Sequence, residues 1–187
     1  MAAILTLTDA IKTTGPWMNE DQAKDALDEE VEKTGLFNIY REVPGYYVQR
    51  RLHQEEKEPR IDRILSPRPK LLDLRWPHGP IGIEVKVPGT KIGPVVAQML
   101  DYSRAIWTVK GFNFYLSWTF LWHLEKQTST IGSILAQHRL GTAYLHRPES
   151  PWGGLFFYSG DLHFLRCRWS GEVELGEASN GRRAGSR

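Results

Sequence analysis

Two charged residues, Glu84 and Lys86, lie in the stretch IGIEVKVPG at positions 81–89, which otherwise has the apolar character of a buried strand. Side chains alternate between the two faces of a strand, so Glu84 and Lys86 share one face, about 7 Å apart, while Val85 points to the other. One interpretation is a half-exposed strand with an ion pair worth at most about 1 kcal/mol. The other is a metal site, in which the carboxylate binds a hard cation and the amine holds or deprotonates a water molecule.

A second acid favours the metal site. Asp62 lies within RIDRIL at positions 60–65, a strand candidate that can pair beside Glu84. Aspartate is disfavoured in strands, so its presence there indicates a specific role. Two carboxylates that converge near one lysine predict a Mg²⁺ site of the kind that activates water against a phosphodiester.

A polar pair follows on the next expected helix. Gln98 and Tyr102 in QMLDY are four residues apart, so they lie on one helix face. Taken alone, the two residues are compatible with an ordinary helix surface. In order along the chain, however, D…E-x-K…Q-x-x-x-Y is far more specific than any of its parts.

This arrangement resembles the PD-(D/E)XK nuclease superfamily, and Q-x-x-x-Y resembles its RecB-type exonuclease branch. YREVPG, ahead of RID, is similar to the segment that many of these nucleases carry before the metal aspartate. The likeness covers about residues 19–141. It implies an α/β fold with a restriction-endonuclease-like αβββαβ core, in which helices flank a central mixed sheet. It also implies a DNA nuclease that uses Mg²⁺, with Mn²⁺ as a substitute.

The resemblance assigns roles to the motif residues. Asp62, Glu84 and the backbone carbonyl of Val85 hold the metal, and Lys86 orients or deprotonates the attacking water. Gln98 supports the site and Tyr102 faces the DNA backbone. These two are the last of the site residues that the resemblance implies. The chain departs from the family pattern in having Ile rather than Pro before Asp62. Its proline-rich connection at 66–80 is a second departure and a candidate DNA-contacting insertion.

The family often adds a carboxylate from the first helix, for which Glu20, Glu29 and Glu30 compete. Residues 19–35 are expected to form that helix, with Asn19 as its N-cap. Glu20 lies about 20° from Leu27 around the helix and so shares the core-facing stripe. We therefore prefer Glu20, and Glu30 remains an alternative. A first-turn acid that stabilises the helix dipole is the competing explanation for Glu20.

Basic side chains cluster in sequence around the expected metal strands. We take as DNA contacts Arg50, Arg51, Arg63 and Lys91, together with Tyr102; the same segment also holds Arg60, Arg68, Lys70 and Arg75. The acids Glu55, Glu56, Glu58 and Asp73 are interspersed, so a mixed solvated surface is the alternative. Three aromatic residues in expected turns or loops, Tyr46, Tyr47 and Trp76, could stack on single-stranded DNA.

The remaining patterns predict one domain over residues 1–170 and a disordered tail over 171–187. Strands are expected at 36–47 with an interruption at 44–45, then at 60–65, 81–88, 112–122 and 142–146. A hairpin is expected over 154–169, turning at 159–160. Further helices are expected at 93–107 and 130–140, and a loop or loose hairpin tip at 66–80.

Composition excludes several classes of protein. The 187 residues carry a net charge of only +2, which by itself does not indicate nucleic acid. The single cysteine, Cys167, excludes an internal disulfide and a self-contained four-cysteine iron–sulfur cluster, and it fits a reducing compartment. No apolar run approaches the roughly 18 residues of a membrane span. We expect a cytoplasmic protein, in the host cytoplasm if a phage encodes it.

Three functions remain open. The leading prediction is a metal-dependent DNA exonuclease of RecB type, without an attached motor, since the chain has no G-x-x-x-x-G-K-[ST] loop. Its partners are then DNA and a separate helicase or recombination protein, with no membrane, and the oligomeric state stays open. A structure-specific endonuclease, either a junction resolvase or a restriction-type enzyme, is the alternative within the enzymes. A non-catalytic DNA- or protein-binding module is the third, and the intact acid–acid–lysine set argues against it.

Overall fold

The first helix, α2, begins and ends where its sequence signals predict. The side chain of Asn19 accepts a hydrogen bond from the backbone N–H of Gln22, and Gly35 ends the helix in the left-handed conformation with φ of 65°. The apolar side chains of α2 pack against the sheet, and its first turn carries Glu20 and Asp21. The expected helix at 19–35 is therefore confirmed.

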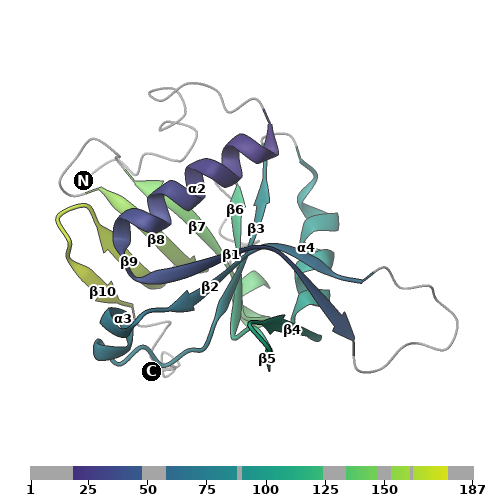
Figure 1. Cartoon of the computed structure of the whole chain (residues 1–187). Coiled ribbons are helices and arrows are strands. Elements are labelled where there is room, and N and C mark those ends of the chain that lie inside the picture. The colour runs from purple at the N-terminus through teal and green to yellow at the C-terminus, as the bar shows by residue number, and fades with distance from the viewer. Residues whose placement is uncertain are drawn as a thin grey trace, which may run out of the picture.

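The computed structural model describes residues 19–47, 58–87, 90–123, 134–146, 153–160 and 162–176. Within these ranges the chain is a mixed α/β protein (Figure 1). Its elements are α2 (Glu20–Thr34), β1 (Phe37–Tyr47), β2 (Arg60–Pro67), α3 (Pro69–Asp73), β3 (Ile81–Lys86), α4 (Ile92–Tyr102), β4 (Ala105–Val109), β5 (Phe112–Phe114), β6 (Trp118–His123), β7 (Leu140–His146), β8 (Gly154–Ser159), β9 (Leu162–Arg168) and β10 (Val173–Leu175). None of the described helices is long and apolar enough to cross a membrane.

The ten strands of the described ranges form one mixed sheet in the order β10-β9-β8-β7-β6-β3-β2-β1-β4-β5. The β3–β6 and β6–β7 pairs are parallel and the other pairs are antiparallel. β3 lies well inside the sheet, with β2 on one side and β6 on the other. The strand that carries Glu84 and Lys86 is thus central, as its apolar flanks predict.

The two long helices cover opposite faces of the sheet. On β6, Phe120 and Trp122 pack in the cluster that includes the apolar side chains of α2. Leu121, between them, packs instead with Val95 and Met99 of α4. Because side chains alternate along a strand, α2 and α4 must lie on different faces.

Cys167 of β9 belongs to the same cluster as α2. It is opposite Leu155 of β8 and Val173 of β10 in the sheet. Its side chain is 2% exposed, and burial raises the pKa of the thiol above its ordinary value. The sheet around Cys167 is therefore a buried core of mainly aromatic and aliphatic side chains.

The Pro44–Gly45 signal, interpreted as an interruption of the strand, marks an exchange of partners instead. β1 runs without a break, pairing with β2 as far as Pro44↔Arg60 and with β4 from Gly45↔Trp107 onward. A Cβ atom on Gly45 would lie 2.9 Å from the Trp107 ring, so glycine is needed for that contact. The expected interruption is wrong, because a strand can change neighbours without bending out of the sheet.

Four other sequence expectations need correction. Residues 66–80 include the short helix α3, which Pro69 can begin because its ring suits a first helical turn. The helix expected to reach residue 107 ends at Tyr102, and 105–109 form β4; the strand expected at 112–122 is two strands, β5 and β6. Of the helix expected at 130–140, the described part is helical at 134–137, and Leu140 begins β7.

The tail expected from residue 171 is also partly wrong. Val173–Leu175 form β10, which pairs with β9. Val173 and Leu175 pack against the core cluster that includes the apolar side chains of α2, and this packing holds the strand in place. Residues 177–187 lie outside the described ranges. The hairpin expected at 154–169 is confirmed, with Gly160 in its turn at φ of 61°.

Candidate active site

Strands β2 and β3 separate at the two acids. Their antiparallel pairing runs from Leu65↔Ile81 to Arg63↔Ile83 and ends there. Continued by one residue, the same register would place Asp62 opposite Glu84. Instead of a strand carbonyl, the Oδ2 atom of Asp62 accepts the backbone N–H of Val85 at 2.8 Å. The end of the ladder thus puts both carboxylates at the fork between the strands.

Glu84 is 2% exposed and has a partner on each oxygen. The Lys86 Nζ lies 2.8 Å from Oε1, and the Tyr102 hydroxyl lies 3.0 Å from Oε2. Burial and the nearby charge of Asp62 raise the pKa of Glu84 to about 7, although Lys86 and Tyr102 act in the opposite direction. A buried carboxylate with a second carboxylate beside it is stabilised by any added cation.

Tyr102 connects this acid to β2 and to Gln98. The single proton of its hydroxyl is shared between two acceptors, the Arg60 carbonyl at 2.7 Å and the Glu84 Oε2 at 3.0 Å, and its oxygen accepts a hydrogen bond from the Gln98 Nε2 at 2.5 Å. Burial and the charge of Glu84 raise the pKa of the Tyr102 phenol above its ordinary value, so the phenol keeps its proton. Tyr102 therefore closes the gap left by the missing β2–β3 hydrogen bonds.

Lys86 bridges Glu84 and the first turn of α2. Its Nζ lies 3.4 Å from the Glu20 Oε2, in addition to its contact with Glu84. Burial lowers the pKa of Lys86, but the charges of Glu84, Asp62 and Glu20 outweigh burial and raise it overall. Lys86 is thus an ammonium in this arrangement.

A second lysine, Lys24, enters the site from α2 and was not expected from the sequence. Its Nζ lies 2.6 Å from the Asp62 Oδ1, 2.9 Å from the Glu42 Oε1 and 3.3 Å from the Glu20 Oε1. Burial lowers the pKa of Lys24, but its hydrogen bonds and charge interactions with Asp62 and Glu42 raise it overall. The spacing of Glu20 and Lys24 by one helical turn is the signal that could have identified it.

Glu42 is the other unexpected member, and its backbone is unusual. It has φ of 49° within β1, a left-handed conformation that is costly for a residue with a side chain. The neighbouring pairs Arg41↔Arg63 and Val43↔Ile61 place it across from Asp62. Nothing in the local sequence indicates this conformation.

The left-handed residue changes the side-chain alternation of β1 and β2. Ile61 and Ile64 of β2 join the same cluster, with Tyr40 and Val43 of β1, although the two members on each strand are three positions apart. Strict alternation would place them on opposite faces. The shift lies between them, at Glu42 and Asp62, and it allows side chains from α2 to reach Asp62.

The three candidate glutamates on the first helix have different partners. Glu20 contacts both Lys24 and Lys86. Glu29 and Glu30 pair with Lys33 at 2.9 Å each, away from the other acids. The geometry thus agrees with the preference for Glu20.

Several expected DNA contacts are not placed to touch DNA. Arg63 is 3% exposed, and its Nε lies 2.6 Å from the Asp28 Oδ1 in a buried ion pair. Tyr102 is 2% exposed, and its hydroxyl contacts Glu84 and the Arg60 carbonyl, so it does not face a DNA backbone. Both expectations are wrong, because sequence position does not show which way a side chain turns in a strand or helix.

The other candidates divide between exposed and undescribed positions. Lys91 is exposed at the N-cap of α4, and Arg50 and Arg51 lie outside the described residues. Arg68 and Lys70 belong to the α3 region, which lies on the other side of the molecule from α4 (Figure 1). Among the described residues, Lys91 therefore does not share one patch with Arg68 and Lys70.

The three candidate stacking residues also differ from one another. Tyr46 is 42% exposed, whereas Trp76 is 6% exposed and packs edge-on against Phe37 and Phe164. Tyr47 is half-buried beside the cluster that includes Trp107. Only the exposure of Tyr46 suits a base-stacking role among these three.

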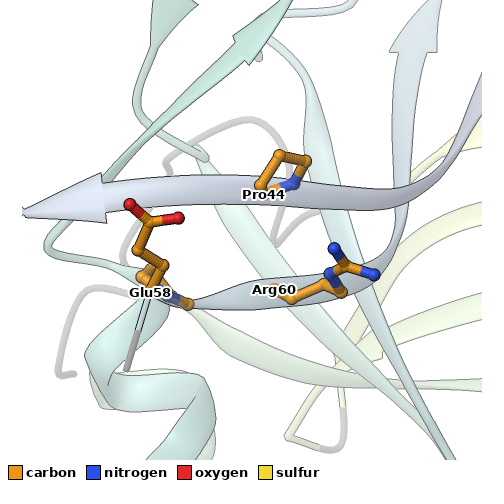
Figure 2. A pocket seen from close by; sticks show the side chains of 4 residues that line it. Pro44, Glu58 and Arg60 are labelled. Atoms are coloured by element: carbon orange, nitrogen blue, oxygen red, sulfur yellow. The ribbon is translucent and has the colours of Figure 1, made fainter. Parts of the chain in front are cut away.

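An open pocket of about 510 Å³ lies beside the fork, lined by Pro44, Glu58, Pro59 and Arg60. Figure 2 shows Glu58 and Arg60 along one segment and Pro44 across from them on β1. Because the Arg60 carbonyl accepts from Tyr102, one hydrogen bond links the pocket wall to the candidate site.

The expected metal ligands are all oxygen atoms, which is the donor type that a hard divalent cation prefers. In the described part of the chain, no three His, Cys, Asp or Glu side chains gather in a way that could hold a metal. The expected set has two carboxylates and a backbone carbonyl, and Mg²⁺ commonly binds through one or two carboxylates while keeping several waters. The mutual repulsion of Asp62 and Glu84 is the feature that such a cation would relieve.

Comparisons of the chain with protein-family models, with curated proteins and with solved structures give no match.

Proposed function

We propose that the chain is a metal-dependent DNA nuclease with a restriction-endonuclease-like core. The observation that carries the proposal is the fork of β2 and β3, where Asp62 and Glu84 meet and Lys86 lies 2.8 Å from Glu84. Two carboxylates that can hold a metal ion, with a lysine beside them, form a set that can polarise a phosphodiester and activate a water for its hydrolysis.

The order of elements supports the same core. The series α2, β1, β2, β3, α4 and β6 has the αβββαβ order, with adjacent strands β1, β2, β3 and β6. The hairpin of β4 and β5 is then an insertion that extends the sheet beyond β1. Strands β7 to β10 extend it beyond β6.

The residues of the sequence motif have the following roles in this proposal. Asp62, Glu84 and the Val85 carbonyl hold the metal, which when bound supplies charge stabilisation at the scissile phosphate and a water of lowered pKa. Lys86 is an ammonium, so it donates to the attacking water and orients it. Gln98 and Tyr102 fix the position of Glu84.

The test is digestion of linear duplex, covalently closed circular and single-stranded DNA with Mg²⁺, Mn²⁺ or EDTA. Glu84→Gln keeps the shape of the side chain but removes the charge, and we expect turnover to fall by at least about 10³-fold. Glu29→Gln is the matched control, since Glu29 is an exposed helix acid that pairs only with Lys33 among the described contacts. It should keep full activity.

The substrates separate the functional classes. Degradation of linear but not circular DNA supports a RecB-type exonuclease, and cutting of circles supports an endonuclease. Equal activity in the wild type and Glu84→Gln, or no metal-dependent cleavage of any substrate, contradicts the proposal and leaves a binding module.

A further inference from the structure

Lys24 holds the Asp62 carboxylate in the way that a bound cation would. Its side chain is 12% exposed, and its Nζ lies 2.6 Å from the Asp62 Oδ1. The other oxygen of Asp62 accepts the Val85 N–H. Both oxygens of the acid therefore have a positively polarised partner already.

The ammonium also has two other carboxylates in contact. Glu42 lies 2.9 Å away and Glu20 lies 3.3 Å away. Glu42 is held opposite Asp62 by a strained left-handed backbone, and its side chain is 43% exposed. A lysine with three acidic neighbours can leave one of them and still remain paired.

We propose that Lys24 is an internal competitor for the divalent cation at Asp62. Its ammonium neutralises Asp62 in the metal-free protein, and it retreats to Glu42 and Glu20 when the cation binds. The inference rests on the metal site of the proposed function and deepens it, because it makes Lys24 and Glu42 the residues that set metal affinity. Lys24 is thus a positioning residue that acts through Asp62.

The physical reason is charge repulsion at short range. A cation bound to Asp62 would lie within a few ångströms of an ammonium that contacts the same carboxylate, in a site that is largely shielded from water. Like charges at such a distance repel strongly when the effective dielectric constant is low. Moving the ammonium away relieves this repulsion, and Glu42 provides the place to move to.

The experiment is calorimetric titration of the DNA-free protein with Mn²⁺ at low ionic strength, so that activity is not the readout. Lys24→Met keeps the apolar stem and removes the charge. We expect it to bind Mn²⁺ about tenfold more tightly than the wild type. Lys33→Met is the matched control: it removes the same charge from the same helix, but Lys33 pairs with Glu29 and Glu30. It should bind Mn²⁺ as the wild type does.

A double-mutant cycle with Glu42→Gln gives a second test that does not depend on Lys24→Met alone. In the wild-type background, loss of Glu42 removes the place to which Lys24 retreats, so Mn²⁺ binding should weaken severalfold. In the Lys24→Met background the same change should have a smaller effect. Equal effects in both backgrounds, or a Lys24→Met affinity no greater than that of Lys33→Met, overturn the proposal.

The two proposals fail in different ways. If the wild type binds Mn²⁺ and cleaves DNA while Lys24→Met does not bind more tightly, the competitor role is wrong and the nuclease stands. If neither the wild type nor Lys24→Met binds Mn²⁺, both are wrong. Unfolding curves for each variant confirm that the titrated protein is folded.

Discussion

Asp62 and Arg63 are adjacent in β2, yet their side chains enter two ionic networks of different character, which a longer contact of 3.7 Å between the Arg63 Nη1 and the Glu42 Oε1 connects. Arg63 and Arg41 each place Nε 2.6 Å from a different oxygen of Asp28, so one acid has two guanidinium partners. At the fork, Asp62 and Glu84 repel each other, and burial raises the pKa of Glu84 to about 7. We call the first network balanced because each oxygen of its buried acid has a cationic partner, and the second unbalanced because its two acids repel each other.

The backbone differs in the same way. Arg63 is paired on both sides, with Arg41 of β1 and Ile83 of β3. Asp62 lies just beyond the last β2–β3 pair and opposite the left-handed Glu42. The repulsion between Asp62 and Glu84 and the strained backbone at Glu42 both lower the stability of the folded protein at the fork. Such local losses of stability occur often at functional sites.

The comparison predicts the largest loss of stability in the balanced network. Arg63→Met leaves Asp28 buried with Arg41 alone, and we expect the free energy of unfolding to fall by about 3 kcal/mol. Arg41→Met is the control, because the Arg41 side chain is 56% exposed, and it should cost about 1 kcal/mol or less. Urea unfolding of both variants measures the difference. Equal losses would show that the Asp28–Arg63 pair is not a structural anchor.

In the unbalanced network, removing a charged side chain should instead raise the stability, and only above about pH 4.5. The pKa of Glu84 is raised from 4.5 to about 7. Below pH 4.5 the carboxyl is protonated in both the folded and unfolded states, so it costs nothing. Between pH 4.5 and about 7 the unfolded chain ionises this acid while the folded protein keeps its proton, so stability falls across this range and the loss is complete above about pH 7.

Glu84→Gln removes this cost. At pH 8 without metal, we expect the variant to be more stable than the wild type by up to about 3 kcal/mol, because a tenfold change in an acid's ionisation constant corresponds to about 1.4 kcal/mol. At pH 4.5 the two should be equally stable. Thermal unfolding across this range measures the effect, and a pH-independent difference would contradict the assigned cause.

The smallest expected effect isolates the backbone strain at Glu42. Glu42→Ala and Glu42→Gly both remove the carboxylate that contacts Lys24, but only glycine adopts φ of 49° without cost. We expect Glu42→Gly to be more stable than Glu42→Ala by about 1 kcal/mol. If alanine is the more stable of the two in denaturant unfolding, the left-handed conformation does not store strain.

The sequence predicts those parts of the site that depend on spacing along one element. Glu84 and Lys86 share a strand face, and Gln98 lies one helical turn from Tyr102, so simple periodicity brings each pair together. Both contacts are present in the structure. The helix ends at Asn19 and Gly35 follow from capping chemistry in the same way.

The parts that the sequence does not predict depend on pairing between elements. The change of β1 partner at Pro44–Gly45 is decided by β4, which is remote in the chain. Arg63 does not contact DNA as expected because its guanidinium is buried against Asp28, which lies 35 residues away in the chain. Lys24 joins the site because β1 and β2 shift their alternation at Glu42, a backbone event without a residue-type signal.

Cys167 gives this protein a built-in chemical probe. The chain has a single thiol, which lies 2% exposed between β8 and β10. The thiolate is the nucleophile that attacks an alkylating reagent, so the buried native thiol should react slowly and become modified only when this side of the sheet opens. The rate of labelling therefore measures opening of the sheet around β8, β9 and β10. A cysteine introduced near the fork could be labelled selectively, because the native thiol would contribute little reaction of its own.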